Sequence, residues 1–291
     1  MLPVPPRARN RGGVTLPTGH LVGRADELGS LERLLDELDR GCPGAVEVAG
    51  APGIGKTRLL REVAAWAGAR GHLVLSGAAS EFERDPPFSV FIDALDEYVA
   101  GLEPARLAVL DDAVQAELAH VFPSLSALAD GREVAAQSER YRSHRAVREL
   151  LERLAAPTPL VLVLDDLHWA DSASVELLGA LLRRPPAAAV LVAVALRPRQ
   201  TPERLSAALE RAHRAAALTR IGLGALTPLR PGSFSAKPLT PPTEPPCTSR
   251  AAATPSTWSS SFGRLSAPVR SPPCLRPRWP ASASRPPWPP R

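Results

Sequence analysis

The sequence predicts an α/β fold, a three-layer sandwich with a parallel central sheet, from three observations. Strand-like and helix-like patterns alternate along residues 20–225, as they do where crossover helices join parallel strands. The run Leu160–Leu164 is unbroken and apolar, which is typical of a parallel strand covered on both faces. A glycine-rich turn separates the short apolar segment Ala45–Ala49 from a helical pattern.

The individual elements follow from periodicity and from the glycine and proline residues between them. The expected strands are Ala45–Ala49, His72–Ser76, Leu160–Leu164, Ala188–Leu196 and Leu218–Leu223. The first expected helix begins at Ala25 and stops near Gly41. The other expected helices are Gly55–Ala69, Phe88–Val99, Ala105–His120, Glu139–Leu154, Ser172–Arg183 and Pro202–Ala215, with Ser172 as an N-cap candidate.

Composition divides the 291 residues into an N-terminal segment (1–19), a domain (20–225) and a C-terminal tail (226–291). The tail holds 17 of the 33 prolines and nine Lys/Arg residues against one acid, Glu244, for a net charge of +8. Residues 1–225 carry 26 basic and 29 acidic residues, so the positive charge does not indicate a nucleic-acid-binding face on the domain. Both flanking segments are expected to be disordered by composition.

Several classes of protein are excluded. The longest apolar runs, Pro159–Leu164 and Ala187–Leu196, fall short of the roughly 20 residues that span a bilayer. The N-terminus lacks the apolar stretch of a signal peptide. The three cysteines, Cys42, Cys247 and Cys274, form neither a disulfide framework nor a metal-ligand spacing. We expect a cytoplasmic protein with no membrane partner.

A phosphate-binding motif lies between a predicted strand and a predicted helix. The residues Gly50-Ala51-Pro52-Gly53-Ile54-Gly55-Lys56-Thr57 match the pattern G-x-x-x-x-G-K-S/T in its required context. The glycines let the backbone N–H groups surround an anion, and the lysine reaches the β- and γ-phosphates. The Thr57 hydroxyl is a ligand for Mg²⁺. The sequence therefore predicts a P-loop NTPase that binds ATP with Mg²⁺.

Two acids at the end of an apolar strand give a second, independent signal. Asp165 follows Leu160–Leu164, at the strand end where ligands bind in open α/β sheets, and would hold Mg²⁺ through water. Asp166 is either a general base for the attacking water or a solvated loop residue. Arg197 ends the next buried strand, where it either contacts the γ-phosphate or is simply solvated. His168 is either a partner of these groups or a structural loop residue.

These motifs together resemble the AAA-like ATPase domain of STAND-type regulators. The resemblance rests on Leu21-Val22-Gly23-Arg24, on the Gly50–Thr57 loop followed by Arg58-Leu59-Leu60, on the Asp165–Asp171 run and on Ala195–Pro198. It is closest to the module of large bacterial LuxR-type transcriptional regulators. The resemblance implies that Val22, Gly23 and Arg24 lie near the adenine and ribose, that Arg58 belongs with the phosphate loop, and that Arg197 acts as a sensor. It also implies contacts with other protein subunits and, in a full-length relative only, with DNA.

The function expected is an ATP-binding regulatory switch with slow hydrolysis. The alternative is a nucleotide-binding module that does not hydrolyse, because Asp166 is shorter than the glutamate that could stand there. A protein that binds DNA by itself is disfavoured, since no recognition helix is present and a basic tail gives only salt-sensitive, non-specific affinity.

The tail departs from the LuxR-type pattern, because it carries no lid, helical-repeat or helix-turn-helix motif. We expect it to be an out-of-frame product of a GC-rich gene. A shifted frame across residues 251–260 can encode the Gly-Asn-Pro-Phe motif that the resembling family has in its lid.

Overall fold

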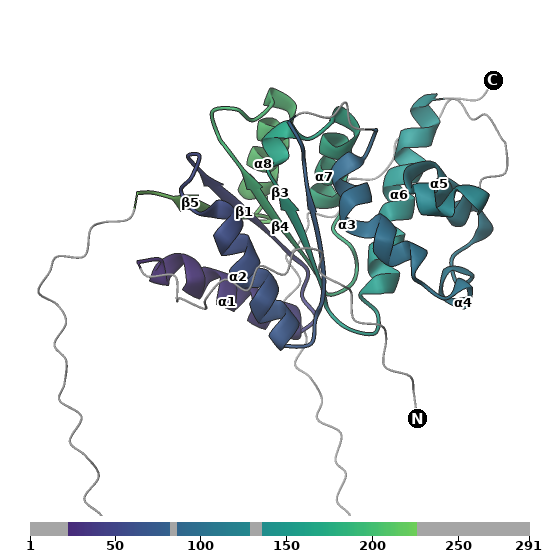
Figure 1. Ribbon diagram of the computed structural model, residues 1–291, viewed down its shortest axis with the longest axis horizontal. Helices are drawn as coiled ribbons and strands as arrows, with labels where there is room; N and C mark the ends of the chain where they lie inside the picture. Colours follow the sequence, from purple (N-terminus) through teal and green to yellow (C-terminus); the bar gives the residue numbers. More distant parts are fainter. Residues whose placement is uncertain (1–22, 82–85, 129–135, 226–291) are drawn as a thin grey trace, which may run out of the picture. The chain divides into compact units, whose positions relative to one another are not determined.

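The computed structural model describes residues 23–81, 86–128 and 136–225, all of them within the unit Met1–Thr227 (Figure 1). Five parallel strands form one sheet in the order β2-β3-β4-β1-β5. These strands are β1 (Gly44–Gly50), β2 (Leu73–Ala78), β3 (Leu160–Asp165), β4 (Val190–Leu196) and β5 (Thr219–Leu223). The α/β class and the parallel sheet expected from the sequence are confirmed. The expectations for residues 1–22 and 226–291 lie outside the described residues.

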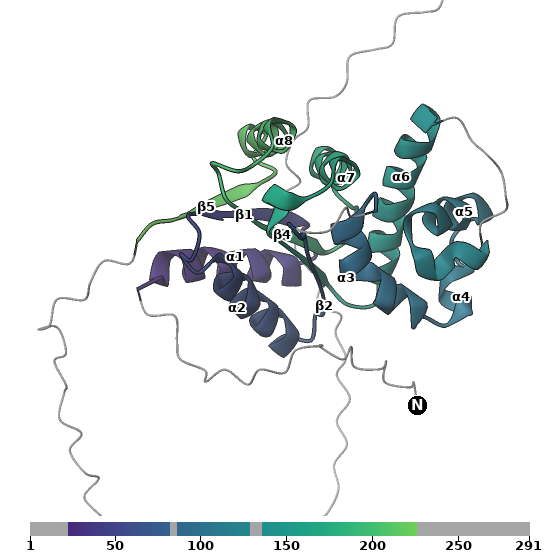
Figure 2. The same ribbon diagram turned by 45° about the horizontal axis from the view of Figure 1, so that its top comes forward.

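Helices cover both faces of this sheet, as Figure 2 shows most clearly. The helices α1 (Ala25–Asp39) and α2 (Lys56–Ala69) pack on one face. The opposite face carries α3 (Ser89–Ala100), α6 (Ala136–Leu154), α7 (Ser172–Arg183) and α8 (Glu203–Arg214). The short α4 (Pro104–Leu107), α5 (Asp112–Val121) and the 3-10 helix η1 (Pro123–Leu128) complete this second layer. None of the helices within the described residues is both long and apolar enough to cross a membrane.

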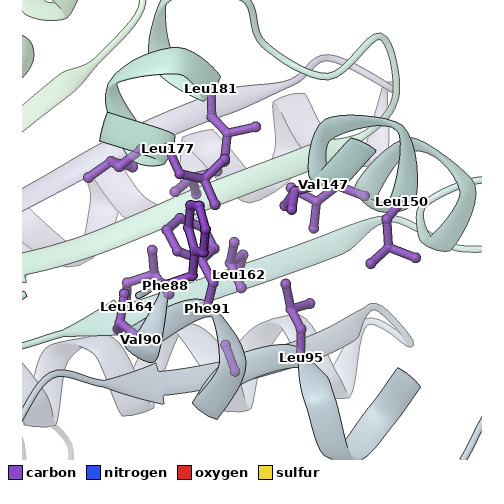
Figure 3. Close-up of a cluster of buried hydrophobic side chains, with 14 of the residues drawn as sticks. Phe88, Val90, Phe91, Leu95, Val147, Leu150, Leu162, Leu164, Leu177 and Leu181 are labelled. Atoms are coloured by element: carbon purple, nitrogen blue, oxygen red, sulfur yellow. The ribbon is translucent and has the colours of Figure 1, made fainter. Parts of the chain in front are cut away.

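Alternating side chains of the strands divide the interior into two cores. In β3, Leu160, Leu162 and Leu164 join the core beneath α3 and α7, whereas Val161 and Val163 join the core beneath α1 and α2. Figure 3 shows the first core, in which Phe91 packs near Leu162 and Leu177. Fully burying one such side chain contributes about 1.5–3 kcal/mol. A strand of this kind must be apolar at every position, which is the pattern that the sequence displayed.

The single helix expected over Ala105–His120 is wrong, because the structure has two helices there. The break falls at Asp111, whose backbone is extended (φ −58°, ψ 145°) and whose carbonyl accepts the N–H groups of Val114 and Gln115 at the start of α5. Leu110 is buried just before this break and accepts a hydrogen bond from the Gln115 side chain. The first acceptor of α5 is thus the Asp111 carbonyl, and the Asp111 side chain makes no capping hydrogen bond to this helix.

The strand order also decides where the site lies. Because β4 pairs with both β1 and β3, the loops that follow these three strands leave the sheet side by side at their carboxyl ends. The phosphate loop, the two acids and Arg197 therefore share one edge of the sheet.

Candidate functional site

The loop after β1 has a backbone that only glycine accommodates well. Gly53 and Gly55 have positive φ angles of +72° and +104°. A Cβ atom on Gly50 would come within 2.9 Å of Ile54 Cγ2 and 3.1 Å of Leu223. The glycines of the motif are thus required by backbone conformation at two positions and by space at the third.

Lys56 is buried at the start of α2, and its side chain reaches back to the beginning of the loop after β1. Its ammonium group donates hydrogen bonds to the carbonyl oxygens of Gly50 (3.2 Å) and Ala51 (3.0 Å). Burial lowers the pKa of Lys56, and the positive charge of Arg197 lowers it further. The carboxylates of Asp166 and Asp165 act in the opposite direction on the same pKa. The ammonium group of Lys56 is therefore held over the loop by two carbonyl oxygens, within the electrostatic influence of both acids and of Arg197.

The N-terminus of α2 suits an anion. No acidic residue lies in its first turn, and the first N–H groups of a helix point away from it without partners in the helix. Thr57 is partly buried in this first turn, and Arg58, one residue further on, is exposed. The exposed Ala51–Gly53 segment and the partly buried Thr57 thus lie beside a helix N-terminus, the kind of position that favours an anion.

The two acids at the end of β3 differ in their local structure. One oxygen of the Asp165 carboxylate accepts the N–H of Asp166 at 2.8 Å, which fixes its orientation. Asp166 itself has a left-handed backbone (φ 51°, ψ 35°) and begins the short 3-10 helix η2 (Leu167–Trp169). Its side chain is 36% exposed, so a ligand at the loop can reach it.

Arg197 follows β4, between the loop after β1 and the acids after β3. Its Nη1 donates to the Gln200 side chain at 3.1 Å, and its carbonyl accepts from Gln200 and Thr201. Its Nε is buried and has no hydrogen-bond partner among the described residues. The guanidinium therefore keeps part of its donor capacity for another group.

His168, which the sequence left as either a partner of the acids or a structural loop residue, is buried beside Asp166. It is 4% exposed and its ring lies 5.1 Å from that of Trp169, at an interplanar angle of 41°. Its Nδ1 is 3.9 Å from Asp166 Oδ1. Burial lowers the pKa of His168 and the charge of Arg197 lowers it further, so the neutral imidazole is favoured.

Of the Val22–Arg24 segment, Val22 lies outside the described residues and Gly23 has a positive φ of +82°. Arg24 is 5% exposed, and its guanidinium binds protein groups. It donates to Glu27 at 2.9 Å, to the Ile54 carbonyl at 3.4 Å and to the Gly224 carbonyl at 2.7 Å. This side chain joins the phosphate loop to the chain that leaves β5. Its expected position near adenine and ribose stays a prediction.

The expected N-cap of α7 is wrong, since Asp171 caps this helix in place of Ser172. The Asp171 carboxylate accepts the N–H groups of Ala173 and Ser174. Aspartate caps a helix at least as well as serine, so the residue before Ser172 was the signal to consider. The same carboxylate also accepts the N–H groups of Phe88 and Ser89, which no local pattern indicates.

Comparisons with known proteins bear on the family of this domain. The sequence profile of the AAA ATPase domain matches residues 20–195. An uncharacterized protein of Rhizobium meliloti (strain 1021) is 28% identical over 203 residues, which make up 65% of this chain and 20% of that protein. The chain thus spans about a fifth of the length of this curated relative.

Solved structures show a more distant likeness. A crystal structure of Cdc6p from Pyrobaculum aerophilum has a TM-score of 0.42 and 17% identity, covering 71% of this chain and 47% of that one. A structure of Drosophila ORC bound to GC-rich DNA and Cdc6 has a TM-score of 0.34 and 12% identity, covering 73% and 64%.

Proposed function

The chain belongs to the AAA ATPase domain family, and from this premise we propose that it is a regulatory switch that binds ATP with Mg²⁺ and hydrolyses it slowly. The observation that carries the proposal is the buried ammonium of Lys56. It lies over a glycine loop at an acid-free helix start, and the charges of Asp165, Asp166 and Arg197 all act on it. This arrangement supports binding of a triphosphate and leaves acids beside its terminal phosphate.

We assign a role to each side chain on the same grounds. Thr57 and Asp165 would hold the magnesium ion, which neutralises charge on the phosphate oxygens. Asp166 would accept the proton of a water molecule as its oxygen bonds to the γ-phosphorus. The bond to the bridging oxygen then breaks, and its electron pair leaves with ADP. Arg197 would stabilise the negative charge that develops on the transferred phosphoryl group.

A narrower proposal concerns the protein in which this domain works. The motifs from Leu21 to Leu28 and from Asp165 to Asp171 resemble those of LuxR-type transcriptional regulators. We propose that the domain is the ATPase module of a regulator of this kind, with other protein subunits as partners. Binding to DNA is proposed only for a longer relative.

Binding is tested by isothermal titration of the protein with ATP and Mg²⁺. Replacing Lys56 with alanine should lower the affinity by about 100-fold, because a charge-assisted hydrogen bond to phosphate is lost. The control is Arg61→Ala, which removes a positive charge from an exposed position on the same helix and should change the affinity by less than about twofold. Equal affinity of the wild-type protein and the Lys56→Ala variant contradicts the proposal.

Hydrolysis is tested separately by single-turnover measurement of Asp166→Asn. Asparagine also tolerates a left-handed backbone, so the variant should keep its loop conformation. Loss of turnover with unchanged ATP affinity supports the general-base role. Turnover as fast as in the wild type contradicts this role, and tight binding without any wild-type turnover supports the alternative module that binds nucleotide only.

A further inference from the structure

His168 is a polar side chain without a hydrogen-bond partner in the described part of the chain. Its side chain is fully buried, yet neither Nδ1 nor Nε2 has a hydrogen-bond partner there. More than about 90% of buried polar groups in proteins are bonded, and one left unbonded costs about 1–3 kcal/mol. An apolar residue would fill the same space without this cost. The stability of the fold therefore does not explain the imidazole.

The groups around His168 have the hydrogen-bonding capacity that it lacks. Asp166 Oδ1 is 3.9 Å from Nδ1, and a shift of about 1 Å would bring the two atoms to hydrogen-bond distance. The buried Nε of Arg197 is also unpartnered among the described residues, and the charge of Arg197 acts on the imidazole. The charges of Lys56 and Asp165 also act on the pKa of His168.

Donors and acceptors match in this group. A neutral imidazole has one N–H donor and one acceptor nitrogen. The Asp166 carboxylate is only an acceptor, and the Arg197 guanidinium is only a donor. One tautomer of His168, with the proton on Nδ1, is therefore complementary to both groups.

We propose that His168 is a positioning residue, which in the ATP-bound state donates from Nδ1 to Asp166, accepts from Arg197 at Nε2, and holds both groups at the terminal phosphate. This inference rests on the function proposed above. The hydrogen bond fixes the rotamer of the carboxylate that takes the proton of the water, and the second bond fixes the guanidinium. The left-handed backbone of Asp166 is consistent with this, because strained residues of this kind gather at functional sites.

Three substitutions separate positioning from simple packing. His168→Leu keeps the bulk of the side chain without polar atoms, His168→Asn keeps an N–H near the place of Nδ1, and His168→Gln keeps a polar group near Nε2. Single-turnover hydrolysis should fall about 10- to 100-fold in His168→Leu, the usual loss when a supporting hydrogen bond is removed. His168→Asn should keep a higher rate than His168→Leu, although thermal unfolding should show His168→Leu to be at least as stable as the wild type.

A packing role predicts the reverse order. In that case His168→Leu turns over like the wild type, and His168→Asn is the impaired and destabilised variant, a result that overturns the proposal. ADP affinity should change by less than about twofold in all three variants, because ADP lacks the phosphate at which the two held groups act. A matching loss of ADP and ATP affinity also overturns the positioning role.

The tautomer is tested directly by ¹⁵N NMR of protein labelled at its six histidines, with His168→Asn assigning the signal. A non-hydrolysable ATP analogue with Mg²⁺ should shift the His168 signal to the Nδ1–H form, whereas ADP should not; identical spectra overturn the proposal. Wild-type protein that binds no ATP, or binds it without turnover, overturns the proposed hydrolysing switch and the role of His168 with it. Wild-type turnover that His168→Leu leaves unchanged overturns only the role of His168.

Discussion

His168 and Asp171 are three residues apart, but their polar atoms differ completely in how many hydrogen bonds they make. The Asp171 carboxylate accepts six hydrogen bonds, from the N–H groups of Phe88, Ser89, Ala173 and Ser174 and from the hydroxyls of Ser89 and Ser174. The imidazole of His168 has no hydrogen bond among the described residues. The Asp171 carboxylate is thus fully hydrogen-bonded within the described part of the fold, whereas the His168 imidazole is not.

This difference in hydrogen bonding distinguishes a residue that stabilises the fold from residues of the proposed site. Burial alone would raise the pKa of Asp171, but the hydrogen bonds from Ser174, Phe88 and Ser89 outweigh it and lower the pKa. This carboxylate joins the start of α3 to the start of α7, which is a structural task. The segment at Asp166–His168 instead combines a left-handed residue with unpartnered nitrogens. We infer that the Asp171 carboxylate serves the fold, whereas the unpartnered nitrogens of His168 are available to the proposed site.

Replacing Asp171 with alanine should have the largest effect on stability. The change removes the cap of α7 and leaves the N–H groups of Phe88 and Ser89 without their acceptor. We expect the free energy of unfolding in urea to fall by about 2–4 kcal/mol. His168→Leu should not lower it. Equal destabilisation by the two substitutions would contradict the distinction between the hydrogen-bonded Asp171 and the unbonded His168.

Glu47 offers a second satisfied group, in the middle of β1. It is 4% exposed, and its carboxylate accepts a hydrogen bond from Arg220 Nε at 2.9 Å, while Arg220 Nη1 donates to Glu210 at 3.1 Å. Glu47→Gln should destabilise the domain by about 1–3 kcal/mol, because Arg220 loses its buried counter-charge. The control Glu210→Gln, at the exposed end of the same arginine, should cost less than about 1 kcal/mol in the same urea titration.

Ionisation of Asp171 should make the unfolding free energy depend on pH. This contribution should be smaller than the whole loss of unfolding free energy in Asp171→Ala. Because folding lowers the pKa of Asp171, the ionised carboxylate stabilises the fold above the unfolded value, about 3.9. That contribution is lost as the pH falls through the lower, folded pKa. The difference in unfolding free energy between the wild type and Asp171→Asn should therefore be constant above about pH 5 and shrink in acid. A difference that grows in acid has the wrong sign and rejects this assignment.

The smallest effect is expected where the site is strained. Asp166→Gly removes a side chain from a left-handed backbone and should stabilise the domain by about 0.5 kcal/mol, since relief of strain exceeds the entropy cost of glycine. Ala216→Gly is a matched control, because Ala216 is exposed and has a φ of 54° after α8. Both should gain stability in thermal unfolding, but only Asp166→Gly should lose hydrolysis. Loss of hydrolysis in both variants would mean that the loss comes from a change in the fold and not from removal of the Asp166 carboxylate.

Local signals explain what could be predicted from the sequence. The glycine loop, the apolar strand before Asp165 and the helix that begins after Gly55 are each encoded within about a dozen neighbouring residues, so their type and order were predicted correctly. The helix over Ala105–His120 was predicted wrongly because its periodicity continues through Asp111, whose extended backbone separates two helices in the structure. Ser172 was expected to cap α7, but Asp171 does so; both residue types cap helices, so residue type alone does not distinguish the two neighbours.

The sequence by itself determined the fold class, the phosphate loop and the identity of the acids, because these depend on local spacing and on residue type. Only the tertiary structure decided that β4 lies between β1 and β3, and hence that Arg197 acts on Lys56. It also decided that Asp171 binds Phe88, 83 residues earlier, and that Arg24 binds Gly224, 200 residues later. The burial of His168 belongs to the same group. Such contacts depend on which faces of distant elements pack together, and the residue periodicity within a single helix or strand does not specify its packing partner.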